Sequence, residues 1–142
     1  MYGNTNKVMG NHFEADLCDL LSEAGWWAHN MAQNETGQPA DVIAVKCDHA
    51  VLIDCKVCSN DTFPLTRIEA NQEGAMTLWE ECGNCFCYFA LKMTDGRIYM
   101  VNFDSVSEPG KSVLHEKDIR QYEEFSDWLV DMDTWLEERE CM

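Results

Sequence analysis

The chain has 142 residues and a formal net charge of −16, from 26 acidic and 10 basic side chains. Its hydrophobic content of 46% and its five tryptophans exclude a disordered chain and favour one globular domain over residues 1–142. No apolar run approaches the roughly 18–20 residues of a membrane span, and the first ten residues do not resemble a signal peptide, so we expect a cytoplasmic protein without a membrane partner.

The N-terminal half is predicted to form one helix and three strands. Apolar residues recur every three or four positions over residues 5–24, which predicts a helix. A first strand is predicted over residues 26–31, and residues 34–38 form a polar loop. Two short runs rich in Val and Ile, residues 41–45 and 51–55, then predict the two strands of a hairpin.

The C-terminal half is predicted to form two helices and two strands. A helix is expected over residues 66–82, and strands over residues 85–92 and 97–103 are joined by an Asp-Gly turn. Residues 117–140 predict an acidic amphipathic helix outside a core of about residues 5–103. With a right-handed crossover from the third strand through the second helix, this order predicts an α/β sandwich around a mixed sheet.

Charged residues interrupt the predicted hairpin. Asp54 and Lys56 are two positions apart on one strand and so share a face, and Asp41 opens the neighbouring strand close to that face. An ordinary ion pair on a solvated sheet explains most such pairs, but buried charges need a metal or a counter-ion to offset their cost. Two carboxylates and a lysine on paired strands are what a phosphodiesterase site with Mg²⁺ requires, because the carboxylates bind the cation and the lysine orients or deprotonates the attacking water.

Two more polar residues are within reach of this face. Glu14 borders the apolar stripe of the first helix, where it is either the edge of a solvated face or a third carboxylate that completes a metal site. Gln72 lies in the polar middle of the helix over residues 66–82, where it either faces solvent or points at the sheet. The residues alone leave both alternatives open.

The cysteines have a spacing that is typical of a zinc site. Cys55-x-x-Cys58 and Cys82-x-x-Cys85 are separated by 23 residues. However, Cys55 and Cys58 differ in parity along a strand and therefore point to opposite faces. We expect buried, reduced thiols rather than a zinc or iron–sulfur centre.

These motifs, in this order, resemble the PD-(D/E)XK nuclease superfamily, and within it the Holliday junction resolvases of the RecU type and their phage relatives. The resemblance covers roughly residues 8–101 and implies a restriction-endonuclease-like αβββαβ core. The matching segments are Gly10-Asn-His-Phe-Glu14, Pro39-Ala-Asp41, Ile53-Asp-Cys-Lys56, Thr62-Phe-Pro-Leu65 with Ile68 and Gln72, and Phe86–Leu91.

The resemblance implies a metal-dependent DNA endonuclease that cuts four-way junctions, with Mg²⁺ as cofactor and Mn²⁺ as a substitute. Because symmetric cutting of a junction needs two active sites, a homodimer on branched DNA is expected. The residue roles it implies are metal binding by Glu14, Asp41, Asp54 and the carbonyl of Cys55, a catalytic role for Lys56 and a place for Gln72 in the lining of the site.

The negative charge departs from the family pattern, because such resolvases are usually basic. Two alternatives follow. An acidic protein can act as a DNA mimic that inhibits a DNA-binding enzyme on a nuclease scaffold, although a mimic needs no lysine between buried acids. A repair or restriction-like nuclease acting on other DNA structures would use the same residues as a resolvase.

Overall fold

The computed structural model describes residues 5–31, 40–107 and 110–139, with side chains from His12 onward in the first helix; the predicted loop over residues 34–38 lies outside the described residues. None of the described helices is both long enough and apolar enough to span a membrane. The elements in chain order are α1 (Thr5–Glu23), β1 (Trp27–Asn30), β2 (Val42–Lys46), β3 (His49–Val57), β4 (Phe63–Pro64), the 3-10 helix η2 (Leu65–Arg67), α2 (Ala70–Glu81), β5 (Cys87–Lys92), β6 (Ile98–Asn102), α3 (Phe103–Val106), β7 (Val113–Leu114), α4 (Glu116–Ile119), β8 (Glu123–Glu124) and α5 (Phe125–Glu137).

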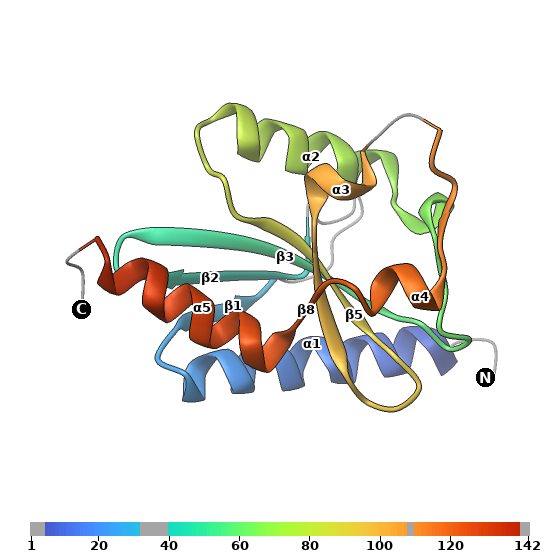
Figure 1. Cartoon of the computed structure of the whole chain (residues 1–142), viewed down its shortest axis with the longest axis horizontal. Coiled ribbons are helices and arrows are strands. Elements are labelled where there is room, and N and C mark those ends of the chain that lie inside the picture. Colours follow the sequence, from blue (N-terminus) through green and yellow to red (C-terminus); the bar gives the residue numbers. More distant parts are fainter. Residues whose placement is uncertain (1–4, 32–39, 108–109, 140–142) are drawn as a thin grey trace.

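The main sheet has six strands in the order β1-β2-β3-β5-β6-β8. The strands β3 and β5 run parallel, and the other neighbours in this sheet are antiparallel. The connection between the parallel strands contains α2, which lies on the opposite side of the sheet from α1 in Figure 1. This arrangement confirms the predicted α/β sandwich with a mixed central sheet.

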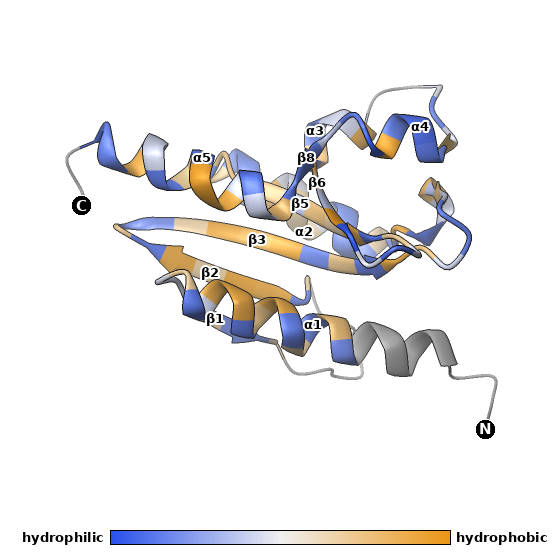
Figure 2. Ribbon diagram, turned by 60° about the horizontal axis from the view of Figure 1, so that its bottom comes forward, coloured by the Kyte–Doolittle hydropathy of each residue, from blue (hydrophilic) through white to orange (hydrophobic). Residues whose placement is uncertain are grey.

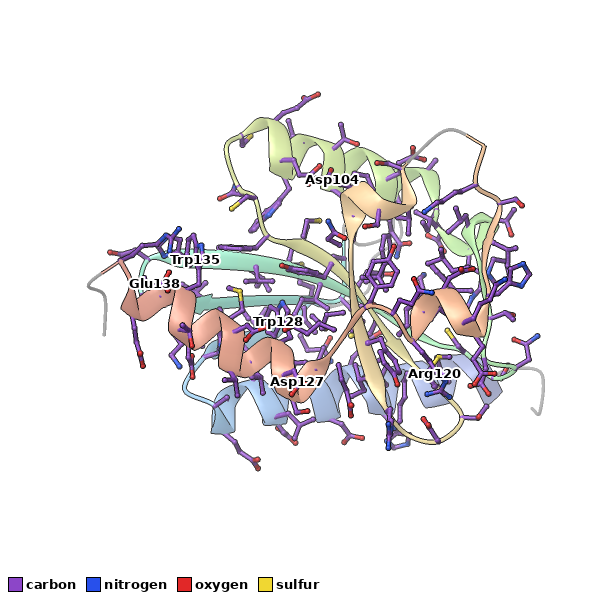
Figure 3. All side chains as sticks on the ribbon, viewed as in Figure 1. Asp104, Arg120, Asp127, Trp128, Trp135 and Glu138 are labelled. Atoms are coloured by element: carbon purple, nitrogen blue, oxygen red, sulfur yellow. The ribbon has the colours of Figure 1, made fainter. Side chains whose placement is uncertain are left out.

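The sheet separates two hydrophobic cores. On one face, residues of α1 and α5 pack against alternate residues of β3, including Ile53 and Cys55. Figure 3 shows the side chain of Trp128 between α5 and the sheet, where it is buried and stacks on Trp26 with ring centroids 5.8 Å apart. The opposite face of the main sheet is covered by other elements.

The other core contains α2, α3, α4 and the two-stranded sheet of β4 and β7. Phe63, Met76 and Phe103 are buried there, together with Leu52 of β3. Figure 2 colours most of β3 as apolar, with hydrophilic residues interrupting it toward one end. A strand that is buried between two helical layers usually consists almost entirely of apolar residues. The hydrophilic residues of β3 therefore indicate a part of the strand that does more than pack.

The predicted helix over residues 66–82 is wrong in its first turn. The chain first forms β4, which pairs with β7, and then the 3-10 helix η2, after which Ile68 is extended. The helix α2 begins at Ala70 because a capping box holds its N-terminus, with the Glu69 amide donating to Gln72 Oε1 at 3.2 Å.

The predicted helix over residues 117–140 is also wrong, because three elements occupy its span. The helix α4 ends at Ile119, which is buried in the core with α2, whereas Phe125 and Trp128 of α5 are buried in the core with α1. The chain must therefore cross from one face of the sheet to the other, and it does so through β8, which pairs with Tyr99 and Met100 of β6. A single helix cannot cover both faces.

Candidate active site

Three carboxylates from three elements meet at one end of β3. Asp54 lies in β3 and is fully buried, Asp41 directly precedes β2 and is 6% exposed, and Glu14 of α1 is 8% exposed. The amide of Asp41 donates to the carbonyl of Ile53 at 3.1 Å, and Asp41 Oδ2 accepts a hydrogen bond from the Cys55 amide at 2.7 Å. These two bonds hold the carboxyl of Asp41 against the strand that carries Asp54.

The pKa values of these acids show how closely they are packed. Burial raises the pKa of Glu14 to about 7, and the charge of Asp41 and a hydrogen bond with it add to the effect. Burial likewise raises the pKa of Asp54 well above its usual range, with the charge of Asp41 as a further cause, and nearby Lys56 opposes the rise. The site therefore disfavours three ionised carboxylates unless a cation is present.

Lys56 supplies one positive charge to this cluster. Its Nζ lies 3.2 Å from Asp54 Oδ2, and its side chain is 13% exposed. Asp54 Oδ2 is buried and still accepts no well-oriented hydrogen bond from the described part of the chain. Lys56 can balance only one of the three carboxylates when they are ionised, and one buried oxygen stays incompletely satisfied.

The donor set fits a hard divalent cation. Among the described residues, no group of three or more His, Cys, Asp or Glu side chains is arranged so that it could hold a metal ion. Mg²⁺ does not require one, because it is usually bound through one or two carboxylates and keeps several waters. Asp41 and Asp54 lie next to each other where β2 pairs with β3, and these two carboxylates meet that requirement.

Gln72 points at the sheet, as one of the two sequence alternatives predicted. It is 6% exposed, and its Nε2 donates to Asp54 Oδ1 at 2.9 Å. Its Oε1 accepts from Lys56 Nζ at 3.4 Å and also from the Glu69 amide. The N-terminal turn of α2 is thus tied directly to the Asp54–Lys56 pair.

The four cysteines of the two Cys-x-x-Cys motifs, all of them described, form no cluster that could hold a metal ion. Cys55 lies in the core with α1 and Cys58 in the core with α2, which confirms that they point to opposite faces. Burial raises the pKa of Cys58 to about 11, so that it stays a neutral thiol. The expectation of buried thiols holds for Cys55 and Cys58 but is wrong for Cys82 and Cys85, which are exposed after the end of α2.

Two cations near the site were not singled out from the sequence. Arg67 Nη1 donates to the carbonyl of Val57 at 2.9 Å, and Lys92 of β5 lies opposite Val57 in the sheet. Neither residue stands in a local motif, so only the parallel pairing of β3 with β5 and the position of η2 reveal that both lie beside Val57, the residue after Lys56.

Comparisons with known proteins agree with this geometry. The family model described as archaeal Holliday junction resolvase (Hjc) matches residues 5–132. The chain belongs to the archaeal Holliday junction resolvase family. It is therefore a nuclease of the junction-cleaving class, as the sequence predicted. The resemblance predicted from the sequence covered roughly residues 8–101, whereas the family model extends through β8 and into α5. The elements α3 to β8 and the first part of α5 therefore belong to the family fold.

A solved structure supports the fold of this resolvase. Hjc from Archaeoglobus fulgidus, described as a Holliday junction resolvase from an archaeal hyperthermophile, is 21% identical with a TM-score of 0.65, over 85% of this chain and 95% of that chain. No curated protein sequence matches significantly. The family match and this structural likeness together support the predicted membership of the PD-(D/E)XK type, while the finer likeness to RecU-type and phage resolvases stays a prediction.

Proposed function

We propose that this resolvase is a Mg²⁺-dependent endonuclease that cuts four-way DNA junctions, with Mn²⁺ able to substitute, and that it acts in the cytoplasm as a single nuclease domain. The observation that carries the proposal is the buried cluster of Glu14, Asp41 and Asp54 beside Lys56 at one end of β3. Such a cluster costs stability unless it serves to hold a cation.

Asp41 and Asp54 would hold the cation, with Glu14 and the carbonyl of Cys55 completing its surroundings. When bound, a divalent ion supplies positive charge at the scissile phosphate and lowers the pKa of a water molecule. Burial raises the pKa values of Glu14 and Asp54, so these two groups would give up their protons when the ion binds.

Lys56 would orient the attacking water and offset the negative charge that develops on the phosphate. Its ammonium group is partly exposed and already lies 3.2 Å from a carboxylate oxygen of Asp54, so it needs no large movement to face a phosphate beside the metal. Gln72 keeps Asp54 and Lys56 in place through its two hydrogen bonds. Gln72 is therefore a positioning residue.

We also propose that two copies form a homodimer, because two symmetric cuts need two active sites. The exposed apolar side chain of Leu78 on α2 borders a hollow of about 330 Å³ whose other lining includes Met31, Ile43, Leu52 and Trp79. This hollow lies over the half of the sheet formed by β2 and β3, on its α2 face, and is the surface we assign to the partner copy.

The function is tested with labelled four-way junction, duplex and single-stranded DNA, each with Mg²⁺ and with a chelator. We expect the junction to be cut only with Mg²⁺. Asp54→Asn and Lys56→Ala should each abolish cutting, because the first removes a metal ligand and the second removes the charge that faces the phosphate.

Asp127→Asn and Lys117→Met serve as matched controls, because they remove the same charges at exposed positions in α5 and α4. Both should cut like the wild type, and circular dichroism should show all four variants folded. Undiminished cutting by Asp54→Asn and Lys56→Ala, or cutting in the chelator, would rule the mechanism out. Binding to DNA-processing enzymes without any cutting of DNA would support the DNA-mimic alternative instead.

A further inference from the structure

Arg67 of η2 lies on the same edge of β3 as the carboxyl of Asp41. Successive residues of a strand direct their N–H and C=O groups to alternate edges, so residues 53, 55 and 57 share one edge. On this edge the Ile53 carbonyl accepts from the Asp41 amide at 3.1 Å, and the Cys55 amide donates to the Asp41 carboxyl at 2.7 Å. The Val57 carbonyl accepts from Arg67 Nη1 at 2.9 Å. The guanidinium therefore follows the Asp41 carboxyl along the edge, two residues or about 7 Å further on.

The guanidinium reaches this edge from the face of the sheet that carries the catalytic pair. The 3-10 helix η2 directly follows β4, whose Phe63 is buried in the core with α2. Asp54 and Lys56 face the same side, because the side chain of Gln72 in α2 binds both. Arg67 thus stands beside Asp54 and Lys56 rather than behind the sheet.

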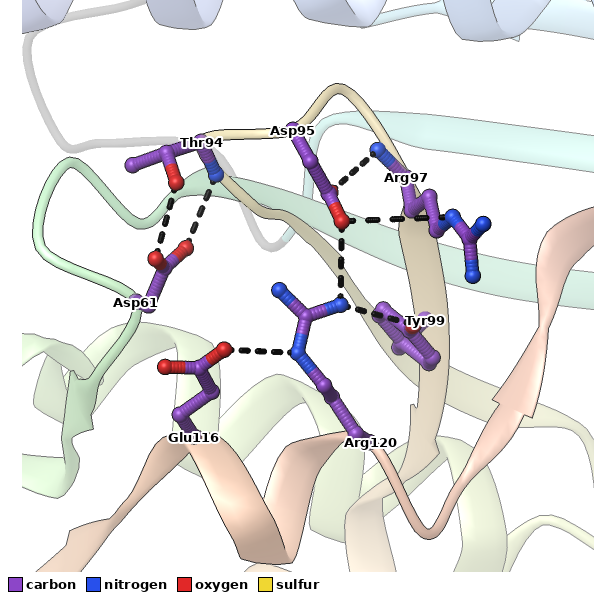
Figure 4. A network of polar contacts seen from close by, with 7 residues as sticks. All are labelled: Asp61, Thr94, Asp95, Arg97, Tyr99, Glu116 and Arg120. Carbon is purple, nitrogen blue, oxygen red and sulfur yellow. Dashed lines mark hydrogen bonds and ion pairs between the residues drawn. The ribbon is translucent and has the colours of Figure 1, made fainter.

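Arg67 differs from the arginines that the protein uses in ion pairs. Figure 4 shows two of these, Arg97 and Arg120, with the carboxylates of Asp95 and Glu116. Arg67 makes no ion pair with an Asp or Glu of the described residues. In a chain of net charge −16, an arginine beside the active site without such a partner suits an anion that comes from outside.

The guanidinium is held in place and still has donors for a ligand. It lies 5.9 Å from the ring centre of Phe63, which is fully buried, and the residue itself is half-buried. A guanidinium carries several N–H donors in a planar fork, and apart from the bond to Val57 no hydrogen bond joins this one to the described part of the chain. The remaining donors match the oxygens of a phosphate.

We propose that Arg67 binds a non-bridging oxygen of the scissile phosphate and, together with Lys56, offsets the negative charge that develops on it. Lys56 approaches this phosphate from the face of β3, and Arg67 approaches it from the edge. Because the Asp41 carboxyl lies on that edge too, a phosphate that reaches the acidic cluster also reaches the guanidinium. This inference rests on the proposed function, since it names a further residue that touches the same substrate.

The test measures binding and cutting separately. Junction affinity is measured in a chelator over a series of salt concentrations, and cutting is measured by single-turnover kinetics with Mg²⁺ at saturating protein. Arg67→Met should lower the single-turnover rate about a hundredfold, because it removes a donor that serves the transition state. The slope of log affinity against log salt concentration should become shallower by about 1, because one phosphate contact is lost.

Two further variants separate the phosphate contact from other effects. Arg67→Lys keeps the charge but replaces the planar fork by a single nitrogen, so it should restore the salt slope and only part of the rate. Arg139→Met removes the same charge above the ring of Trp135, which contacts His49 at the opposite end of β3. It should bind and cut like the wild type.

If the wild type cuts junctions but Arg67→Met keeps the wild-type rate and salt slope, the Arg67 proposal falls and the proposed function stands. A lower melting temperature of Arg67→Met with that same rate and slope would leave Arg67 only a structural contact of η2, and would overturn the proposal equally. A shallower slope with an unchanged rate would place Arg67 on a neighbouring phosphate and overturn its assignment to the scissile one. If the wild type cuts no DNA, the proposed function falls and this inference falls with it.

Discussion

Gln72 is the residue on which the geometry of the catalytic pair depends. Its amide nitrogen donates to a buried oxygen of Asp54, and its amide oxygen accepts from both Lys56 and the amide that starts α2. An amide serves both partners at once because it is donor and acceptor, whereas a carboxylate would add negative charge and an apolar side chain would remove one hydrogen bond from each of them. Gln72 therefore caps the N-terminus of α2 and orients Asp54 and Lys56 with the same side chain.

We predict that Gln72→Met lowers the turnover rate for junction cutting by roughly tenfold or more, because Asp54 and Lys56 lose the group that orients them. The free energy of unfolding should fall by only about 1–2 kcal/mol, for the lost capping bond and the unpaired oxygen of Asp54. Single-turnover kinetics and urea unfolding measure the two effects. Glu73→Met, at the next and exposed position of α2, is the control; an unchanged rate in Gln72→Met would contradict the positioning role.

The helix α2 serves two surfaces. Its N-terminal turn closes the active site through Gln72, and its C-terminal half presents Leu78, which is 59% exposed although it is apolar. The hollow beside Leu78 is formed with Ile43 and Leu52, which lie directly opposite each other on β2 and β3. The proposed dimer contact is therefore connected to the active site through one short helix and one strand.

We predict that Leu78→Asp converts the dimer to monomers, because a carboxylate buried in an apolar contact costs several kcal/mol. Sedimentation equilibrium measures the change, and paired cuts in a junction should give way to single nicks. Val130→Asp, at an aliphatic residue of α5 that is 63% exposed, should leave the oligomeric state unchanged. A Leu78→Asp protein that sediments like the wild type would remove this surface as the dimer contact.

The molecule as a whole is an acidic protein that gathers three buried acids, Glu14, Asp41 and Asp54, in one place. A carboxyl group whose pKa is higher in the folded than in the unfolded state favours folding at low pH, and this contribution is lost as the pH rises through the folded-state value. Glu14 has a pKa of about 7, and the pKa of Asp54 is raised in the same direction. Glu123 also has a pKa of about 7, because of burial and a hydrogen bond with Asp131, away from the site.

We predict that the melting temperature in chelator falls as the pH rises from about 5 to about 8, and that Mg²⁺ at constant ionic strength offsets part of the fall. The stabilisation by Mg²⁺ should therefore grow with pH, because the cation replaces protons among the carboxylates. Differential scanning fluorimetry measures both trends. Glu14→Gln should reduce the pH dependence of the Mg²⁺ effect and Glu123→Gln should not; a Mg²⁺ effect that is independent of pH in the wild type would contradict the assignment.

Local periodicity determined the class of the fold and part of the site. Side chains alternate along a strand, so the positions of Asp54 and Lys56 alone placed them on one face, and the hairpin brought Asp41 to it. The same parity rule correctly separated Cys55 from Cys58. Such inferences need only the spacing of neighbouring residues, which the chain itself contains.

Only the tertiary structure decided which distant groups complete the site. Glu14 and Gln72 were each compatible with a solvated face, and packing of α1 and α2 on opposite sides of the sheet brings both to Asp54 and Asp41. Pairing of β3 with β5 brings Lys92 beside Val57. The apolar residues over 117–140 do not form one helix, because the first of them are buried on one face of the sheet and the last on the other. Periodicity specifies which residues are buried together locally, but the choice between two faces is made by long-range contacts.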